Sequence, residues 1–236
     1  MTAQTLYKVL AYDLHAMHGG SAQYTRGEWT EHLDPTWLEA CRYGYHLVPL
    51  DELIDWMGPT IWEADPCPDH APVEEAGKVV TCAVRLVRQT AWDDTAARLF
   101  AADCAEMALL GERARGREPD ERSWRAVEVV RASARGEATE SERAAAEDAA
   151  EDAARAAACA AAWDAAWAAA WAAAGDAAWD AARVAAWDAA RAAAEDAAED
   201  AARAAARERM AARLAAYLTG SDPGRVTPLY GEEVPA

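Results

Sequence analysis

Residues 161–194 read AAWDAAWAAAWAAAGDAAWDAARVAAWDAARAAA and belong to a four-residue repeat that runs from Arg143 to Leu218. Each repeat has two alanines and two variable positions, most often Trp-Asp, Arg-Ala or Glu-Asp. Alanine is the strongest helix former, and no proline occurs between Pro119 and Pro223. The repeat therefore predicts helix over about a third of the chain.

A period of four does not match the 3.6 residues of a helical turn, so side chains in one slot drift around a straight helix by about 40° per repeat. One continuous helix would be about 110 Å long and would need other copies for support. The alternative is that the chain folds back into shorter helices. We favour the folded-back arrangement and expect a bend at Gly175, the one glycine in the run.

Five tryptophans occupy one slot of the repeat. Large aromatic side chains anchor protein partners, join copies of a chain in an oligomer, or fill the space between alanine-faced helices. All three roles stay open at this point, and the filling role is favoured for most of the five. The predicted binding residues are Trp163, Trp167, Trp171, Trp179 and Trp187.

The first 90 residues have a different character, because short runs rich in β-branched and aromatic residues alternate with Gly and Pro turns. A short amphipathic helix is predicted over residues 49–57, where Leu50, Leu53, Ile54 and Met57 recur at helical spacing. The segment is therefore expected to form a small α+β module. Its predicted strands cover residues 6–12, 44–48, 60–64 and 78–87.

Helical spacing begins after residue 90. An apolar stripe predicts a helix that opens between Thr90 and Asp94 and ends at Gly111, and a second stripe ends at Gly136. Thr139 and Glu142 then have the spacing of a capping box, in which each residue accepts a hydrogen bond from the backbone of the other.

The expected fold class is predominantly α. An α+β module over residues 1–90 is followed by an all-α, alanine-rich helical bundle or long helical hairpin over residues 91–218. An irregular tail covers residues 219–236.

The composition limits the classes of partner. With 41 acidic and 23 basic residues the net charge is −18, and acids outnumber bases in every segment, which disfavours nucleic-acid binding. No run is apolar enough for a membrane span, and the first residues lack the pattern of a secretion signal. We expect a cytoplasmic protein with reduced cysteines.

All five histidines fall within the first 90 residues, where three cysteines lie near them. His15 and His18 form one close pair, and Cys67 and His70 form another. Histidine nitrogen and cysteine sulfur are the ligands that zinc prefers. Cys67 and His70 are the predicted metal pair, with zinc the one cofactor considered and no cofactor the favoured expectation.

Three stretches carry a resemblance to a known family: residues 95–106 (TAARLFAADCAE), residues 122–131 (RSWRAVEVVR) and residues 134–139 (ARGEAT). They resemble the alanine-rich immunity-protein domain of phages and high-GC bacteria, over about residues 92–218. The part before it, with Gly44-Tyr45-His46 and Pro49-Leu50-Asp51, resembles a small uncharacterised domain that is often fused in front. The resemblance implies an all-helical domain that neutralises a toxin.

The leading functional hypothesis is a non-enzymatic, immunity-like or phage-encoded inhibitor. It would bind a toxin or host-defence protein, expected to be basic, through an acidic helical surface. One alternative is a self-assembling helical protein whose alanine and tryptophan positions form the contacts of a homo-oligomer. The other is a metal-dependent or ADP-ribosyltransferase-like activity in the N-terminal module, where Glu63 is the first candidate for a catalytic glutamate and would have to lie with His15, His18 and His46.

Overall fold

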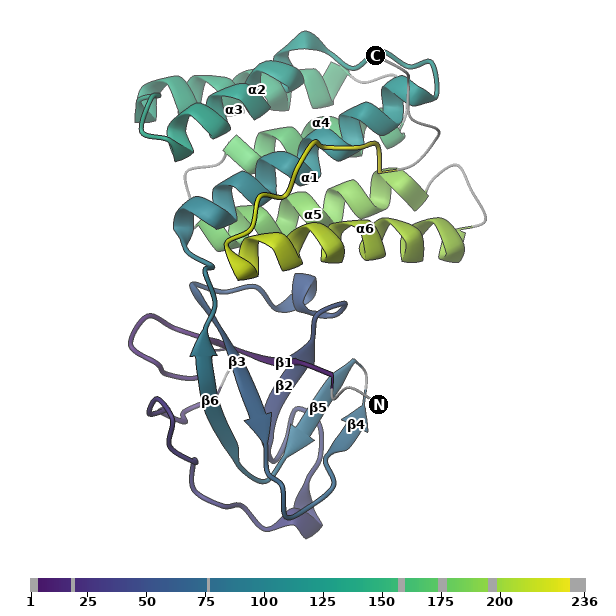
Figure 1. The fold of residues 1–236 in the computed structure, drawn as a ribbon. Coiled ribbons are helices and arrows are strands. Elements are labelled where there is room, and N and C mark those ends of the chain that lie inside the picture. Colours follow the sequence, from purple (N-terminus) through teal and green to yellow (C-terminus); the bar gives the residue numbers. More distant parts are fainter. Residues whose placement is uncertain are drawn as a thin grey trace. The chain divides into compact units, whose positions relative to one another are not determined.

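The structure is a computed structural model that describes residues 4–17, 20–75, 77–156, 160–173, 178–194 and 199–229. Contacts divide the chain into two compact units. The N-terminal unit comprises Met1–Trp92 with Leu218–Gly220, and the helical unit comprises Asp93–Tyr217 with Ser221–Ala236. Figure 1 shows the sheet of the first and the helices of the second.

The N-terminal unit is built on one six-stranded sheet in the order β4-β5-β2-β1-β3-β6, and all neighbouring strands are antiparallel. Two short 3-10 helices, η1 (Pro35–Trp37) and η2 (Leu53–Trp56), lie in its connections. The strands are β1 (Leu6–Leu10), β2 (Tyr45–Pro49), β3 (Thr60–Pro66), β4 (Val73–Glu75), β5 (Lys78–Thr81) and β6 (Val84–Gln89).

The predicted strands form where β-branched and aromatic residues cluster, but two details differ. The run over residues 78–87 divides into β5 and β6 on either side of Cys82 and Ala83, and β4 was not predicted because its three residues are all exposed and do not alternate. The predicted helix over residues 49–57 is wrong. The segment holds only the four-residue η2, although Leu53 and Met57 are fully buried as the apolar spacing suggested.

The predicted fold class is also wrong. The chain is mixed, 48% helical and 19% strand, with a six-stranded antiparallel sheet in its N-terminal part and six helices among the described residues. It is not a predominantly α protein with a separate all-α bundle. The reason is that all four predicted β-rich runs of the N-terminal segment pair into one sheet, so this segment is a substantial β structure instead of a small module before a bundle.

The described residues of the helical unit form six helices. Neighbours in the sequence pack against each other from α1 to α5, and α1 also contacts α4 and α5. The helices are α1 (Asp94–Ala114), α2 (Glu121–Ala134), α3 (Glu140–Ala156), α4 (Ala160–Ala173), α5 (Ala178–Ala194) and α6 (Glu199–Thr219).

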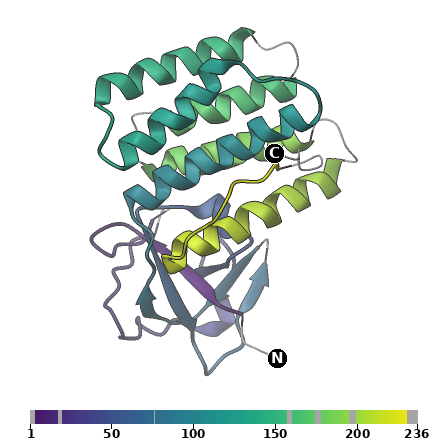
Figure 2. The ribbon, with the colours of Figure 1, turned by 45° about the horizontal axis from the view of Figure 1, so that its top comes forward.

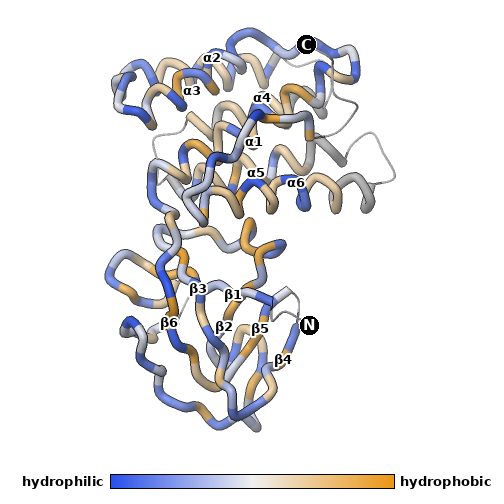
Figure 3. Tube along the Cα trace, in the orientation of Figure 1, coloured by the Kyte–Doolittle hydropathy of each residue, from blue (hydrophilic) through white to orange (hydrophobic). Residues whose placement is uncertain are grey.

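The four-residue repeat spans α3, α4, α5 and α6, so it is not one continuous helix. The expected bend at Gly175 lies outside the described residues. The buried faces of these helices are formed mainly by alanine, for example Ala154 on α3, Ala169 on α4 and Ala186 on α5. Figure 3 shows the apolar colours along much of α4 and α5. Because alanine has a short side chain, the helices approach closely.

Side-chain caps set several helix ends. Asp93 accepts a hydrogen bond from the Ala96 amide at 2.8 Å at the start of α1. The predicted capping box is confirmed: the Thr139 amide donates to Glu142 Oε2 at 2.7 Å, and the Glu142 amide donates to Thr139 Oγ1 at 3.2 Å. After α2, Gly136 has a φ of 74°, a conformation that favours glycine, so the predicted stop at this residue is also right.

Residues 221–229, which follow α6, are anchored to the helical unit, although they form no helix or strand. The Leu229 amide donates to the Met107 carbonyl on α1 at 3.0 Å, and the Arg209 guanidinium on α6 donates to the Pro228 carbonyl at 2.8 Å. The segment passes along α1 and α6 in both views (Figures 1 and 2). No described helix is both long and apolar enough to cross a bilayer.

Candidate functional site

The N-terminal unit contains a pocket of about 630 Å³ beside β1 and β2. Such a volume is within the range of small-molecule sites. The only two lysines of the chain, Lys8 and Lys78, both line it, together with Arg42, His46 and Cys41. The aromatic lining residues are Tyr7, Tyr24, Tyr43, Tyr45 and Trp56.

Lys8 is the innermost cation of the pocket. It lies on β1, donates a hydrogen bond from Nζ to the His46 carbonyl oxygen at 2.9 Å, and places Nζ 5.2 Å from the centre of the Tyr24 ring. Burial lowers the pKa of Lys8 to about 8, because removal from water disfavours the charged form. At neutral pH the side chain is therefore still mostly an ammonium group, held in a poorly hydrated place.

His46 and Lys78 lie on the adjacent strands β2 and β5, and both contact Cys41. His46 Nε2 accepts a hydrogen bond from the Cys41 amide at 2.9 Å, and Lys78 Nζ donates to Cys41 Sγ at 3.1 Å. Lys78 Nζ also lies 4.0 Å from the centre of the Trp56 ring. Burial, and then the charges of Lys8 and Lys78, lower the pKa of His46. The imidazole is therefore neutral at physiological pH.

The loop that carries Cys41 is held close to the sheet. Gly44 has a φ of 129°, and a Cβ at this position would lie 2.4 Å from Val80 Cγ1 on β5. Only glycine allows this approach. The close fit keeps the Cys41 amide within hydrogen-bonding distance of His46.

The pocket lining contains one carboxylate, that of Glu31, and this group is not paired with either lysine among the described residues. Within the part of the chain that the structure describes, neither Lys8 nor Lys78 forms an ion pair with a carboxylate. Arginines of the same sheet behave differently: Arg85 pairs with Asp65 at 2.6 Å, and Arg88 Nε donates to Glu63 at 3.2 Å. The two lysines therefore create a local excess of positive charge in a chain whose net charge is −18.

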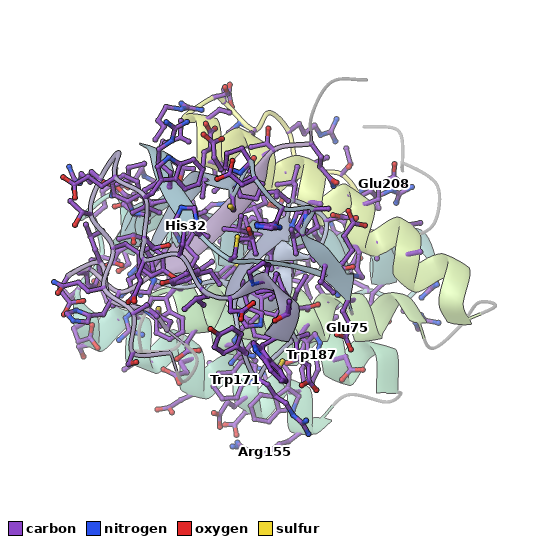
Figure 4. The ribbon with its side chains drawn as sticks, turned by 90° about the horizontal axis from the view of Figure 1, so that it is seen from below. His32, Glu75, Arg155, Trp171, Trp187 and Glu208 are labelled. Carbon is purple, nitrogen blue, oxygen red and sulfur yellow. The ribbon has the colours of Figure 1, made fainter. Side chains whose placement is uncertain are left out.

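A second group of functional side chains lies elsewhere in the same unit. The ligand atoms of His32, Cys67 and Cys82 all lie within 4.8 Å of one another. Cys67 follows β3, Cys82 lies between β5 and β6, and His32 belongs to the segment before η1. Both cysteines are buried and unbridged, whereas His32, labelled in Figure 4, is exposed.

In the structure, the potential metal ligands near Cys67 differ from the predicted one, His70. His70 is not part of the described His32–Cys67–Cys82 group. It is exposed and close enough to Asp34 for its charge to contribute to lowering the pKa of that carboxyl. Spacing along the chain suggested the Cys-x-x-His pair. The pairing of the strands instead brings Cys82 and His32 close to Cys67. No local sequence pattern predicts this contact between distant residues.

The residues proposed for the enzymatic alternative are not collected in the pocket. His46 lines it, but His15 and Glu63 are not among its lining residues. His15 Nδ1 instead lies 3.0 Å from Asp13, and Glu63 pairs with Arg88. His18 lies outside the described residues.

The predicted binding tryptophans have unequal environments. Trp167 and Trp171 on α4 are half-buried with ring centres 6.1 Å apart, and Trp179 on α5 is half-buried. Trp187 on α5 is 58% exposed. Figure 4 labels Trp171 and Trp187 on the helical unit. Trp163 belongs to α4, and its side chain lies outside the described part.

Comparisons with protein-family models, curated proteins and solved structures found no significant match. The resemblance to immunity proteins therefore stays a prediction, and functional conclusions depend on the geometry of the sites.

Proposed function

We propose that the protein binds a small organic anion in the pocket between β1, β2 and the Cys41 loop. The main observation behind this proposal concerns the ion pairing of Lys8 and Lys78. Both line one pocket, and neither has a carboxylate partner among the described residues. A buried cation without a counter-charge is costly, so a bound anion would lower the free energy of this site.

The rest of the lining supports an anion with an apolar or planar body. Tyr24 and Tyr45 pack edge to face with ring centres 6.1 Å apart, and Trp56 adds a further aromatic surface. A few polar groups set among aromatic walls are typical of small-molecule sites. The ligand class is a carboxylate or phosphate ester with an apolar or aromatic group. Lys8 and Lys78 would bind the charged end.

Calorimetric titration with phenyl phosphate and with benzoate tests the proposal, with inorganic phosphate as the probe that lacks the apolar group. We expect saturable binding of at least one aromatic anion, and binding at least tenfold weaker in Lys8→Met and in Lys78→Met. Loss of a charge-assisted hydrogen bond has an effect of this size.

Arg125→Met is the matched control, because Arg125 is an exposed cation of the helical unit that pairs with Glu128 at 3.1 Å. It should bind as the wild type does. Equal affinity in the wild type and both lysine variants, or no saturable binding of any probe, would overturn the proposal. If inorganic phosphate bound with the same affinity as phenyl phosphate, only the proposed aromatic group of the ligand would be contradicted.

We propose a second function for the helical unit, the binding of a protein partner as an immunity-like inhibitor. The observation that favours it is the exposure of Trp187 on the helical unit, since tryptophan is enriched at binding hot spots. The acidic composition favours a basic partner. Self-association through the same residue is the competing outcome.

Sedimentation and affinity capture from the host separate these outcomes. We expect a monomer at micromolar concentration, capture of one basic protein by the wild type, and loss of that protein with Trp187→Ala. Trp179→Ala, a half-buried tryptophan on the same helix, is the comparison. Dimers that Trp187→Ala dissociates would favour assembly, and unchanged capture by Trp187→Ala would exclude Trp187 as an anchor.

A further inference from the structure

We infer that His32, Cys67 and Cys82 form a zinc site with three protein ligands. Their ligand atoms lie within 4.8 Å of one another. In a tetrahedral zinc site, Zn–S bonds of about 2.3 Å and Zn–N bonds of about 2.0 Å place the ligand atoms about 3.5–3.8 Å apart. The arrangement therefore needs contraction by only about 1 Å, within the range of small side-chain rotations.

The chemistry of the three ligands selects the metal. Two thiolates and one imidazole are soft and borderline donors, which favour zinc over magnesium or calcium. The fourth tetrahedral position is open to a water molecule.

Backbone hydrogen bonds hold the three ligand segments together. The Cys67 amide donates to the Ala83 carbonyl at 2.9 Å, and the Leu33 amide donates to the Cys82 carbonyl at 2.9 Å. The residue after His32 is thus tied to Cys82, and Cys67 is tied to the residue after Cys82. The ligands are positioned by the fold before any metal binds, which lowers the entropy that binding must overcome.

Zinc binding displaces one proton from each cysteine, so the product is two thiolate–zinc bonds and two released protons. Zinc affinity should rise with pH as proton competition weakens.

Three protein ligands with an open fourth position are typical of catalytic zinc sites, and a bound metal would also stabilise the fold. The metal would join three segments that are separated by 35 and 15 residues along the chain, and a cross-link of this kind stabilises the folded state. None of the three ligands lines the anion pocket, although Glu31 and Leu33, the neighbours of His32, do.

The first experiment measures metal by mass spectrometry in full-length protein purified without an affinity tag or chelator. We expect about one equivalent of zinc and its loss in His32→Ala and in Cys82→Ser. His70→Ala and Cys41→Ser are the matched controls and should keep the metal. Less than a tenth of an equivalent in the wild type, even after incubation with zinc, would overturn the inference.

A second measurement covers the case in which a cysteine variant does not fold. Cobalt added to metal-free wild-type protein should give the sulfur-to-cobalt charge-transfer absorption and the visible bands of tetrahedral cobalt, whereas His32→Ala, altered at an exposed position, should not. Loss of metal in His70→Ala, or retention in a folded His32→Ala, would overturn the ligand set. If two of the five cysteines resist alkylation after denaturation, a Cys67–Cys82 disulfide would replace the metal site.

Discussion

The Tyr217 hydroxyl donates a hydrogen bond to Asp103 Oδ2 at 2.5 Å, although the two residues are separated by 114 positions in the sequence. Asp103 also accepts from Arg131 Nη2 at 2.7 Å and from Arg213 Nε at 2.6 Å. Its side chain is 4% exposed. Burial, and then the charge of Asp103, raise the pKa of Tyr217, so its hydroxyl stays protonated and donates. One carboxylate thus joins α1, α2 and α6.

Replacement of Asp103 is expected to destabilise the protein strongly. Asp103→Ala should lower the free energy of unfolding by about 3–5 kcal/mol, because it removes the buried carboxylate that pairs with Arg213 and accepts from Tyr217, and leaves Arg131 with Glu106 alone. Urea unfolding followed by circular dichroism measures the change. The control is Glu128→Ala, which removes an exposed ion pair and should cost less than about 1 kcal/mol. Similar losses in the two variants would mean that the Asp103 network is not a major source of stability.

The charge of Lys8 should make anion binding depend on pH. Below pH 8 the side chain is an ammonium group, and above it the charge is lost, so affinity for a bound anion should fall about tenfold for each further pH unit. Titrations between pH 7 and pH 10 measure this decline, and Lys8→Met should lack it. A wild-type affinity that stays constant over this range would show that Lys8 does not contact the anion.

The lowered pKa of Lys8 should also make the free energy of unfolding depend on pH. Folding lowers the pKa of Lys8 from 10.5 to about 8, so the unfolded chain binds more protons between these values. The contribution of Lys8 to the free energy of unfolding should therefore rise with pH across this window, and its burial should be unfavourable below pH 8. Comparison of Lys8→Met with the wild type by urea unfolding at pH 7 and pH 10 isolates this contribution. The variant should be relatively more stable at pH 7.

The tryptophans of the repeat should differ in their contribution to stability. Trp171→Ala should cost about 1–3 kcal/mol, because a half-buried ring that packs against Trp167 is removed. Trp187→Ala should change stability by less than about 0.5 kcal/mol, since most of the side chain is already in water. Urea unfolding of both variants tests the difference. A larger loss for Trp187→Ala would argue that it is a packing residue and not a binding residue.

The capping box at the start of α3 is expected to make a modest contribution to the free energy of unfolding. Thr139→Ala removes the hydroxyl that accepts from the Glu142 amide, and should lower the free energy of unfolding by about 1 kcal/mol. Thr139→Ser keeps the hydroxyl and is the control. A loss of the same size in Thr139→Ser would point to the methyl group and not to the cap.

Local features of the sequence predicted much of the local structure, although α1 ends at Ala114 and not at the predicted Gly111. The capping box at Thr139, the stop at Gly136 and the helical character of the alanine repeat depend on contacts between residues a few positions apart. The helix over residues 49–57 was predicted on the same grounds and was wrong. There the apolar residues are buried by the sheet, and burial alone does not require a full helix.

Contacts between distant residues could not be predicted. Spacing paired Cys67 with His70, whereas pairing of the strands places Cys67 near Cys82 and His32. The convergence of Lys8, His46 and Lys78 likewise arises because β5, β2 and β1 are neighbours in the sheet. A single sequence contains no pattern that specifies this order of strands.

Composition and short-range order determined by themselves the acidic charge, the helical character of the repeat and several helix ends, because these properties depend on residue type and on hydrogen bonds within one turn. Only the tertiary structure decided that the repeat divides into four helices, that the chain is mixed α and β, and which side chains form the basic pocket, the His32–Cys67–Cys82 cluster and the Asp103 network. Each of these requires the chain to bring residues from separate elements together, and such packing depends on the whole fold.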